Sequence, residues 1–134
     1  MLDKEGVHHF ITGDKPKVIY GFTEAGNHTI LANVQNEGLY QLIKDTFSPV
    51  KKLRNNNIHS LTVNSLGNVV VVHDLGIEVI DIEKNQFKLL GDEVGIKEMR
   101  GDLNSICKSL SGEIFIGTEN GIIKYQPSTI FYNR

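Results

Sequence analysis

Histidine and cysteine are the residues of this chain most able to bind a metal ion or to act as a nucleophile, but their positions in the sequence argue against a metal site and against a disulfide. The 134 residues include five histidines and one cysteine. His8 and His9 are adjacent, so in a strand their side chains would point to opposite faces and could not share a metal ion. Cys107 has no second thiol with which to form a disulfide or a zinc site. We therefore expect no metal and no cofactor, and interpret Cys107 as a small buried apolar residue.

Motifs for covalent catalysis and for phosphate binding are also missing from the sequence. It contains no serine in a G-x-S-x-G pattern and no glycine-rich loop with the spacing of a nucleotide-binding site. An active centre needs several titratable groups that converge, and no such cluster stands out. We therefore expect the chain not to be an enzyme by itself.

Composition excludes further classes of function. The 14 lysines and arginines against 16 acidic residues give a net charge of −2, which argues against a nucleic-acid partner. No apolar run approaches the roughly 18–20 residues of a membrane helix, and the charged start shows no signal peptide. With 40% hydrophobic and 22% charged residues, the chain has enough apolar material for the core of one globular domain.

Short strands joined by tight turns are the expected elements. The run Val69 to Val72 is continuously apolar, as in a strand covered on both faces, whereas residues 77–82 alternate with period 2. Glycine and asparagine punctuate such runs throughout the chain. This pattern predicts an all-β fold of antiparallel strands.

Three imperfect repeats divide the chain. Gly38, Gly76 and Gly121 mark corresponding turns, 38 and 45 residues apart, and residues 58–61 and 69–72 match residues 103–106 and 114–117. This period is typical of a propeller blade with four strands. The expected strands of the middle copy are 58–64, 69–73, 77–82 and 86–90.

The repeats predict a partial β-propeller of about three blades. Residues 92–100 lengthen the second period and suggest a helical turn. The expected divisions are a stub over 1–16, whose residues 7–12 form an outer strand of a preceding blade, and blades over 17–57, 58–102 and 103–134.

The segment Leu103 to Tyr125 resembles the two-component regulator propeller repeat. It has an apolar strand, a polar turn with glycine, a strand ending Gly117-Thr118, then Asn120-Gly121 and a strand ending in tyrosine. Phe115 stands where that family usually has tryptophan, and the middle copy has Val72-His73 in place of Gly-Thr. The resemblance implies seven-bladed propellers in the extracytoplasmic sensor region of hybrid two-component regulators, many of which detect oligosaccharides and signal to a cytoplasmic histidine kinase.

The resemblance therefore implies a non-catalytic fragment of a periplasmic, saccharide-responsive sensor, whose partners are the remaining blades of a larger chain. Self-association that completes a ring, or an unusual small fold, would also cover the open flanks of three blades. Two other functions stay open: a fragment of a propeller enzyme, either a lyase or a hydrolase, and a generic protein-interaction scaffold. No kinase or receiver domain is expected within 134 residues.

Topology, rather than a motif, indicates a binding face. In a four-stranded blade the hairpin between the second and third strands and the link to the next blade emerge on one side. Amides and carboxylates there would suit sugar hydroxyls. The expected ligand contacts are His73, Asp74, Glu119 and Asn120. As surface residues, His73 and Glu119 should each tolerate alanine at a cost within about 0.5 kcal/mol.

Overall fold

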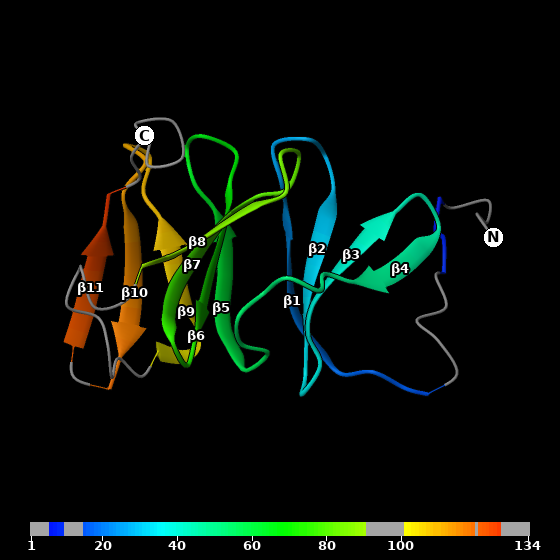
Figure 1. Ribbon diagram of the computed structural model, residues 1–134, viewed down its shortest axis with the longest axis horizontal. Helices are drawn as coiled ribbons and strands as arrows, with labels where there is room; N and C mark the ends of the chain where they lie inside the picture. Colours follow the sequence, from blue (N-terminus) through cyan, green and yellow to red (C-terminus); the bar gives the residue numbers. More distant parts are fainter. Residues whose placement is uncertain (1–5, 10–14, 91–100, 120, 127–134) are drawn as a thin grey trace.

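The computed structural model describes residues 6–9, 15–90, 101–119 and 121–126, and within them the protein is built from eleven β-strands without a helix (Figure 1). No helix in that part of the chain is long and apolar enough to cross a membrane. The strands are β1 (Ile19–Glu24), β2 (Ile30–Val34), β3 (Gly38–Ile43), β4 (Thr46–Pro49), β5 (Ile58–Val63), β6 (Val69–His73), β7 (Gly76–Asp81), β8 (Gln86–Leu90), β9 (Gly101–Lys108), β10 (Ile114–Thr118) and β11 (Gly121–Tyr125).

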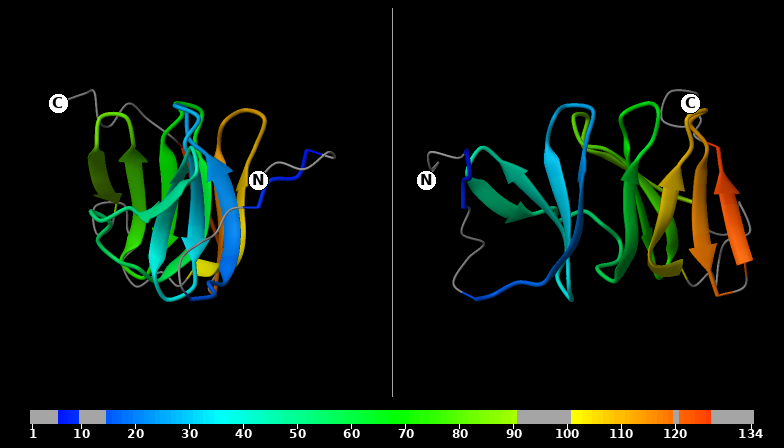
Figure 2. Two further views of the ribbon diagram at one scale, coloured as in Figure 1. Left: turned by 90° about the vertical axis from the view of Figure 1, so that its right-hand side faces the viewer. Right: turned by 180° about the vertical axis from the view of Figure 1, so that it is seen from behind.

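These strands form three antiparallel sheets, each in simple up-and-down order: β1 to β4 (blade 1), β5 to β8 (blade 2) and β9 to β11 (blade 3). The sheets follow one another along the long axis of the molecule (Figures 1 and 2). The first strand of blade 2, β5, lies against the first strands of both neighbours, β1 and β9. The prediction of an all-β fold with blade-like sheets is confirmed.

The repeat markers explain the turns. Gly38, Gly76 and Gly121 are each the first residue of the third strand of a blade, at φ values of 96°, 130° and 141°. Residues that carry a side chain rarely adopt such backbone angles, so glycine suits all three hairpins. The four strands expected in the middle copy agree with β5 to β8 to within one residue at each end.

Some predictions fall partly or wholly outside the described residues. These are the helical turn over 92–100, a fourth strand of the last blade, and residues 10–12 of the isolated outer strand. In the remainder of that strand, His8 forms a single β-bridge. The divisions at residues 17, 58 and 103 stay predictions.

The core consists of two apolar layers, one on each side of blade 2. Because side chains alternate along a strand, Val69 and Val71 face blade 1, whereas Val70 and Val72 face blade 3. This alternation explains why the continuous valine run is fully buried. Blade 1 supplies Leu31 and Leu39 to the first layer, and blade 3 supplies Ile114 and Ile116 to the second.

Close backbone contact joins the blades at the edge formed by the β1–β2, β5–β6 and β9–β10 hairpins. Gly26 N–H donates to Gly67 O at 2.9 Å, and a Cβ on Gly26 would lie 3.1 Å from Gly67 Cα. A Cβ on Gly112 would likewise lie 3.3 Å from the Ser65 side chain. Larger residues at these glycines would force neighbouring hairpins apart.

Candidate functional site at the opposite edge

The hairpins β2–β3 and β6–β7 and the link from β4 to β5 gather at the opposite edge, which is the lower edge in Figure 1 and is called the pole here. The link packs against the first hairpin, since a Cβ on Gly38 would lie 2.8 Å from Asn56 Oδ1. The same link contacts the second hairpin, because Asn57 Nδ2 donates to Asp74 at 2.9 and 3.0 Å. The expectation that hairpins and links share one side is therefore correct for these segments.

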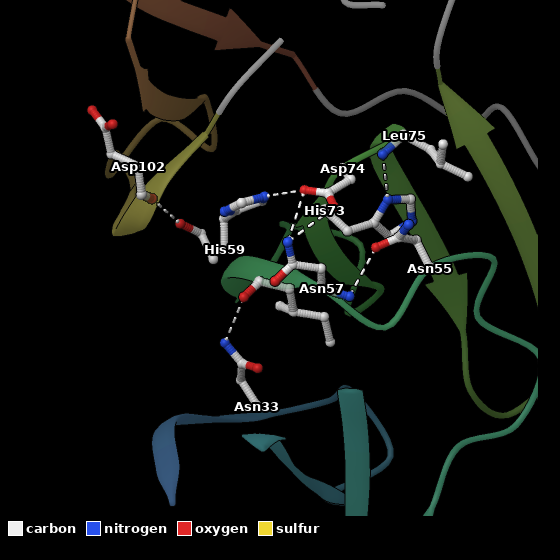
Figure 3. A network of polar contacts seen from close by, with 10 residues as sticks. Asn33, Asn55, Asn57, His59, His73, Asp74, Leu75 and Asp102 are labelled. Atoms are coloured by element: carbon white, nitrogen blue, oxygen red, sulfur yellow. Dashed lines mark hydrogen bonds and ion pairs between the residues drawn. The ribbon is translucent and has the colours of Figure 1, made fainter. Parts of the chain in front are cut away.

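Asp74 is the centre of the polar contacts at the pole (Figure 3). Its Oδ1 lies 2.7 Å from His59 Nε2, and both of its oxygens accept from Asn57. The hydrogen bond from Asn57, followed by that from His59, holds the pKa of the Asp74 carboxyl below its ordinary value despite partial burial. Asp74 is therefore a fixed anion at neutral pH.

A small polar hollow of about 120 Å³ opens beside this cluster, between blades 1 and 2. Among the residues that the structure describes, five of those lining it are asparagine or glutamine, and none is lysine, arginine, aspartate or glutamate. Asn33 fixes one wall by donating from Nδ2 to the carbonyl of Ile58 at 3.2 Å. The lining includes Tyr20 from blade 1, Asn36 from the β2–β3 hairpin, Asn56 and Asn57 from the link, and His59 from β5.

An irregularity in the inner strands explains how Tyr20 and His59 reach the hollow. The β1–β2 register shifts between Ile19 and Gly21, and the β5–β6 register shifts between Ile58 and Ser60. The skipped residues are Tyr20 and His59, at corresponding places in blades 1 and 2. Bulges commonly turn a side chain out of the sheet pattern in this way.

The structure describes three of the four residues chosen from the sequence. Asp74 lies at the pole, about half exposed, and Glu119 is exposed, whereas Asn120 is outside the described residues. The expected surface position of His73 is wrong, because its side chain is fully buried. As the last residue of β6, it continues the alternation of Val69 and Val71 and turns inward.

Sequence reasoning also missed or misplaced other residues. The partner of His59, Asp74, comes 15 residues later in the sequence, and only the pairing of β5 with β6 brings the two together. Cys107 is exposed rather than buried, because it lies on the side of β9 that faces away from blade 2.

The chemistry available at the pole is hydrogen bonding. A histidine held by a carboxylate can act as a base, but it needs a nucleophile or an acidic proton within reach. No serine, threonine or cysteine lines the hollow as the structure describes it, and the nearby Ser60 hydroxyl donates to the carbonyl of Asp102 at 3.1 Å. The arrangement offers hydrogen-bond donors and acceptors to a ligand.

No family model matches this sequence, and no curated protein is similar enough to count as a relative. The fold nevertheless matches crystal structures of two extracellular domains from B. thetaiotaomicron, described as parts of the hybrid two-component systems BT3049 and BT4673. For BT3049 the identity is 17% and the TM-score 0.72, over 86% of this chain and 16% of that one. For BT4673 the identity is 22% and the TM-score 0.66, over 90% of this chain and 17% of that one. This chain thus has the fold of a short section of these extracellular domains.

Proposed function

We propose that this chain is a three-blade section of the ligand-sensing β-propeller of a hybrid two-component sensor, extracytoplasmic, saccharide-responsive and non-catalytic by itself. The fold match supports the larger propeller, and the blade-on-blade core supports the repeat interpretation. The proposal extends the resemblance of residues 103–125 to the propeller repeat.

The outward face of blade 3, formed by Cys107, Phe115 and Ile122, is the observation that carries the proposal. Register pairs His73 with Gly76 and Thr118 with Gly121, so Ile122 occupies the position that Ile77 has in blade 2. Ile77 is 1% exposed beneath blade 3, whereas Ile122 is 79% exposed. An open depression of about 380 Å³ lies over the face.

Because its side chains correspond to those that blade 2 buries beneath blade 3, the outward face of blade 3 is suited to packing against a further blade. Apolar side chains at these positions stabilise the protein by roughly 25 cal/mol per Å² only when a neighbour removes them from water. The two existing interfaces show what such a neighbour supplies, namely branched aliphatic side chains from its second strand, like Val69 and Val71 or Ile114 and Ile116. We propose that the next blade of the parent propeller fills this role.

The hollow at the pole supports a neutral saccharide as the ligand. Asparagine and glutamine side chains donate and accept hydrogen bonds and so match hydroxyl groups. No lysine or arginine within the described part of the chain lines the hollow to attract a sulfate or uronate, and the anionic Asp74, the partner of the lining residue His59, lies beside it. Neutral oligosaccharides should therefore bind in preference to acidic ones.

The test is a dose-response measurement in the intact receptor, with neutral hexaoses of glucose, xylose and mannose as probes. Asn57→Ala and His59→Ala should raise the half-maximal concentration of the active sugar roughly tenfold or more, since each removes a polar contact. Glu24→Ala, at the opposite edge and with an exposed ion pair to His28, is the matched control. Unchanged curves for both pole variants would remove the hollow from the binding site.

A further inference from the structure

A buried charge network distinguishes blade 2 from its neighbours. Glu78 and His73 have fully buried side chains, and Arg54 of the link is about half buried. His73 Nε2 lies 2.8 Å from Glu78 Oε1, and Arg54 NH1 donates to Glu78 Oε2 at 2.6 Å. The backbone N–H of Arg54 also donates to Oε1, at 3.1 Å. Glu78 therefore binds both the side chain and the main chain of the link.

The backbone determines which ring nitrogen of His73 carries the proton. Leu75 N–H, in the β6–β7 hairpin, points at His73 Nδ1 at 3.1 Å, so Nδ1 is the acceptor. Nε2 then carries the proton and donates to Glu78, which leaves the imidazole neutral and the carboxylate charged. The cation that balances Glu78 is Arg54.

Corresponding positions in the other blades show that a blade does not need this network. The residues that correspond to His73 are Val34 and Thr118, and those that correspond to Glu78 are Tyr40 and Ile123. In blade 3 the hairpin is closed locally, by Thr118 Oγ1 donating to Gly121 O at 3.0 Å. Burial of an ion pair costs desolvation energy that apolar residues would avoid, so its presence in blade 2 calls for another role.

The network joins the two segments that carry the polar contacts of the pole. Arg54 lies three residues before Asn57 in the link, and His73 and Leu75 flank Asp74 in the hairpin. Asn57 and Asp74 bind each other, and His59 completes the cluster. Glu78, which is buried beneath these residues, forms hydrogen bonds both to Arg54 of the link and to His73 at the start of the β6–β7 hairpin.

We propose that His73, Glu78 and Arg54 are positioning residues, which hold the link and the β6–β7 hairpin together so that Asn57, His59 and Asp74 are assembled before a ligand arrives. Preorganised contacts lower the ordering cost of binding. The inference concerns the site of the proposed function, but its test measures geometry without a ligand. Failure of the saccharide proposal therefore leaves it standing, and the reverse also holds.

The test transplants the residues of blade 3 into blade 2, as the double variant His73→Thr with Glu78→Ile. Two readouts report the site. The first is hydrogen exchange of the Asn57 backbone amide, which donates to Asn55 Oδ1 at 2.8 Å and involves neither substituted residue. The second, which is secondary because His73 precedes Asp74 in the chain, is the carboxyl titration of Asp74 by NMR. We expect Asn57 exchange to rise roughly tenfold or more, with exchange in the β10 strand unchanged. The pKa of Asp74 should move up toward its ordinary value as its partners loosen.

Tyr40→Phe, at the corresponding position of blade 1, is the matched control and should leave both readouts unchanged. Unchanged readouts in the folded double variant would overturn the proposal. So would a rise in exchange spread evenly over all three blades, because the network would then only add stability. Should the double variant not fold, Arg54→Gln on the half-exposed partner replaces it, and an unchanged Asn57 exchange rate there would equally overturn the proposal.

Discussion

Blades 2 and 3 pair their strands in the same order and register, but the corresponding face is buried in blade 2 and exposed in blade 3. In blade 2, Val70 and Ile77 are buried against the next sheet, whereas in blade 3 the corresponding Phe115 and Ile122 face outward. Both pairs are apolar, so the sequence pattern does not distinguish them. Residue type therefore specifies the blade, and the neighbour decides whether its face is core or surface.

Their hairpins differ in a second way. Blade 3 closes its β10–β11 hairpin with one exposed threonine hydrogen bond, whereas blade 2 uses a buried histidine tied to a glutamate and to the preceding link. Blade 2, which borders the hollow together with blade 1, is thus the one of the two with the costlier buried charges. This contrast suggests that the polar core of blade 2 serves the site rather than the fold.

The largest expected effect comes from a matched pair in the two blades. Ile77→Ala removes a buried side chain and should cost about 2–5 kcal/mol of unfolding free energy in the isolated chain. Ile122→Ala, at the corresponding exposed position, should stay within about 0.5 kcal/mol. Urea denaturation measures both. Equal losses would show that the outward face of blade 3 is already covered in the isolated chain.

The next effect concerns His73. His73→Ala leaves Leu75 N–H without its acceptor and removes one of the three hydrogen bonds to Glu78, so it should cost about 1–3 kcal/mol rather than the small loss expected for a surface residue. Thr118→Ala in blade 3 should cost less, about 1 kcal/mol or below, because its site is partly solvated. A smaller loss at His73 than at Thr118, in the same denaturation assay, would argue against the buried network.

Acid should weaken the same network. Burial alone would raise the pKa of the Glu78 carboxyl, but the hydrogen bonds from His73 and Arg54 together outweigh it and hold the pKa below its ordinary 4.5. The carboxylate thus favours the folded state, and its contribution is complete above about pH 4.5 and is lost as the pH falls through the lower folded value. Denaturation midpoints measured from neutral pH downward should show this loss, and Glu78→Gln should flatten it. A curve for that variant with the original slope would exclude Glu78 as its source.

The smallest expected effect on stability is at the pole surface. His59→Ala removes a partly exposed pair with Asp74, which should cost within about 1 kcal/mol because such pairs contribute little. Its folded structure should therefore persist, as judged by amide chemical shifts away from the hollow. A loss as large as that of Ile77→Ala would mean that His59 is structural.

The sequence predicted the strands and turns well, because these depend on residues that are close together in the chain. Alternation, glycine turns and the repeat located β5 to β8 almost residue by residue. It predicted the site poorly because the site depends on pairing across strands. His73 belongs to a hairpin in the sequence but to the core in space, and His59 meets Asp74 only through the β5–β6 register. Cys107 looked apolar enough to be buried, yet its exposure depends on a neighbouring blade.

The rate at which a maleimide labels Cys107 tests the central claim most directly, that a further blade covers the outward face of blade 3. Cys107 is exposed on this face and is the only cysteine of the 134 residues, so mass spectrometry of its peptide reports one site. In the isolated chain at low concentration, labelling should be fast. In the intact receptor it should be slower by roughly tenfold or more, because access controls thiol reactivity. Equal rates in both would contradict the account, since the face would then be open surface in the working protein.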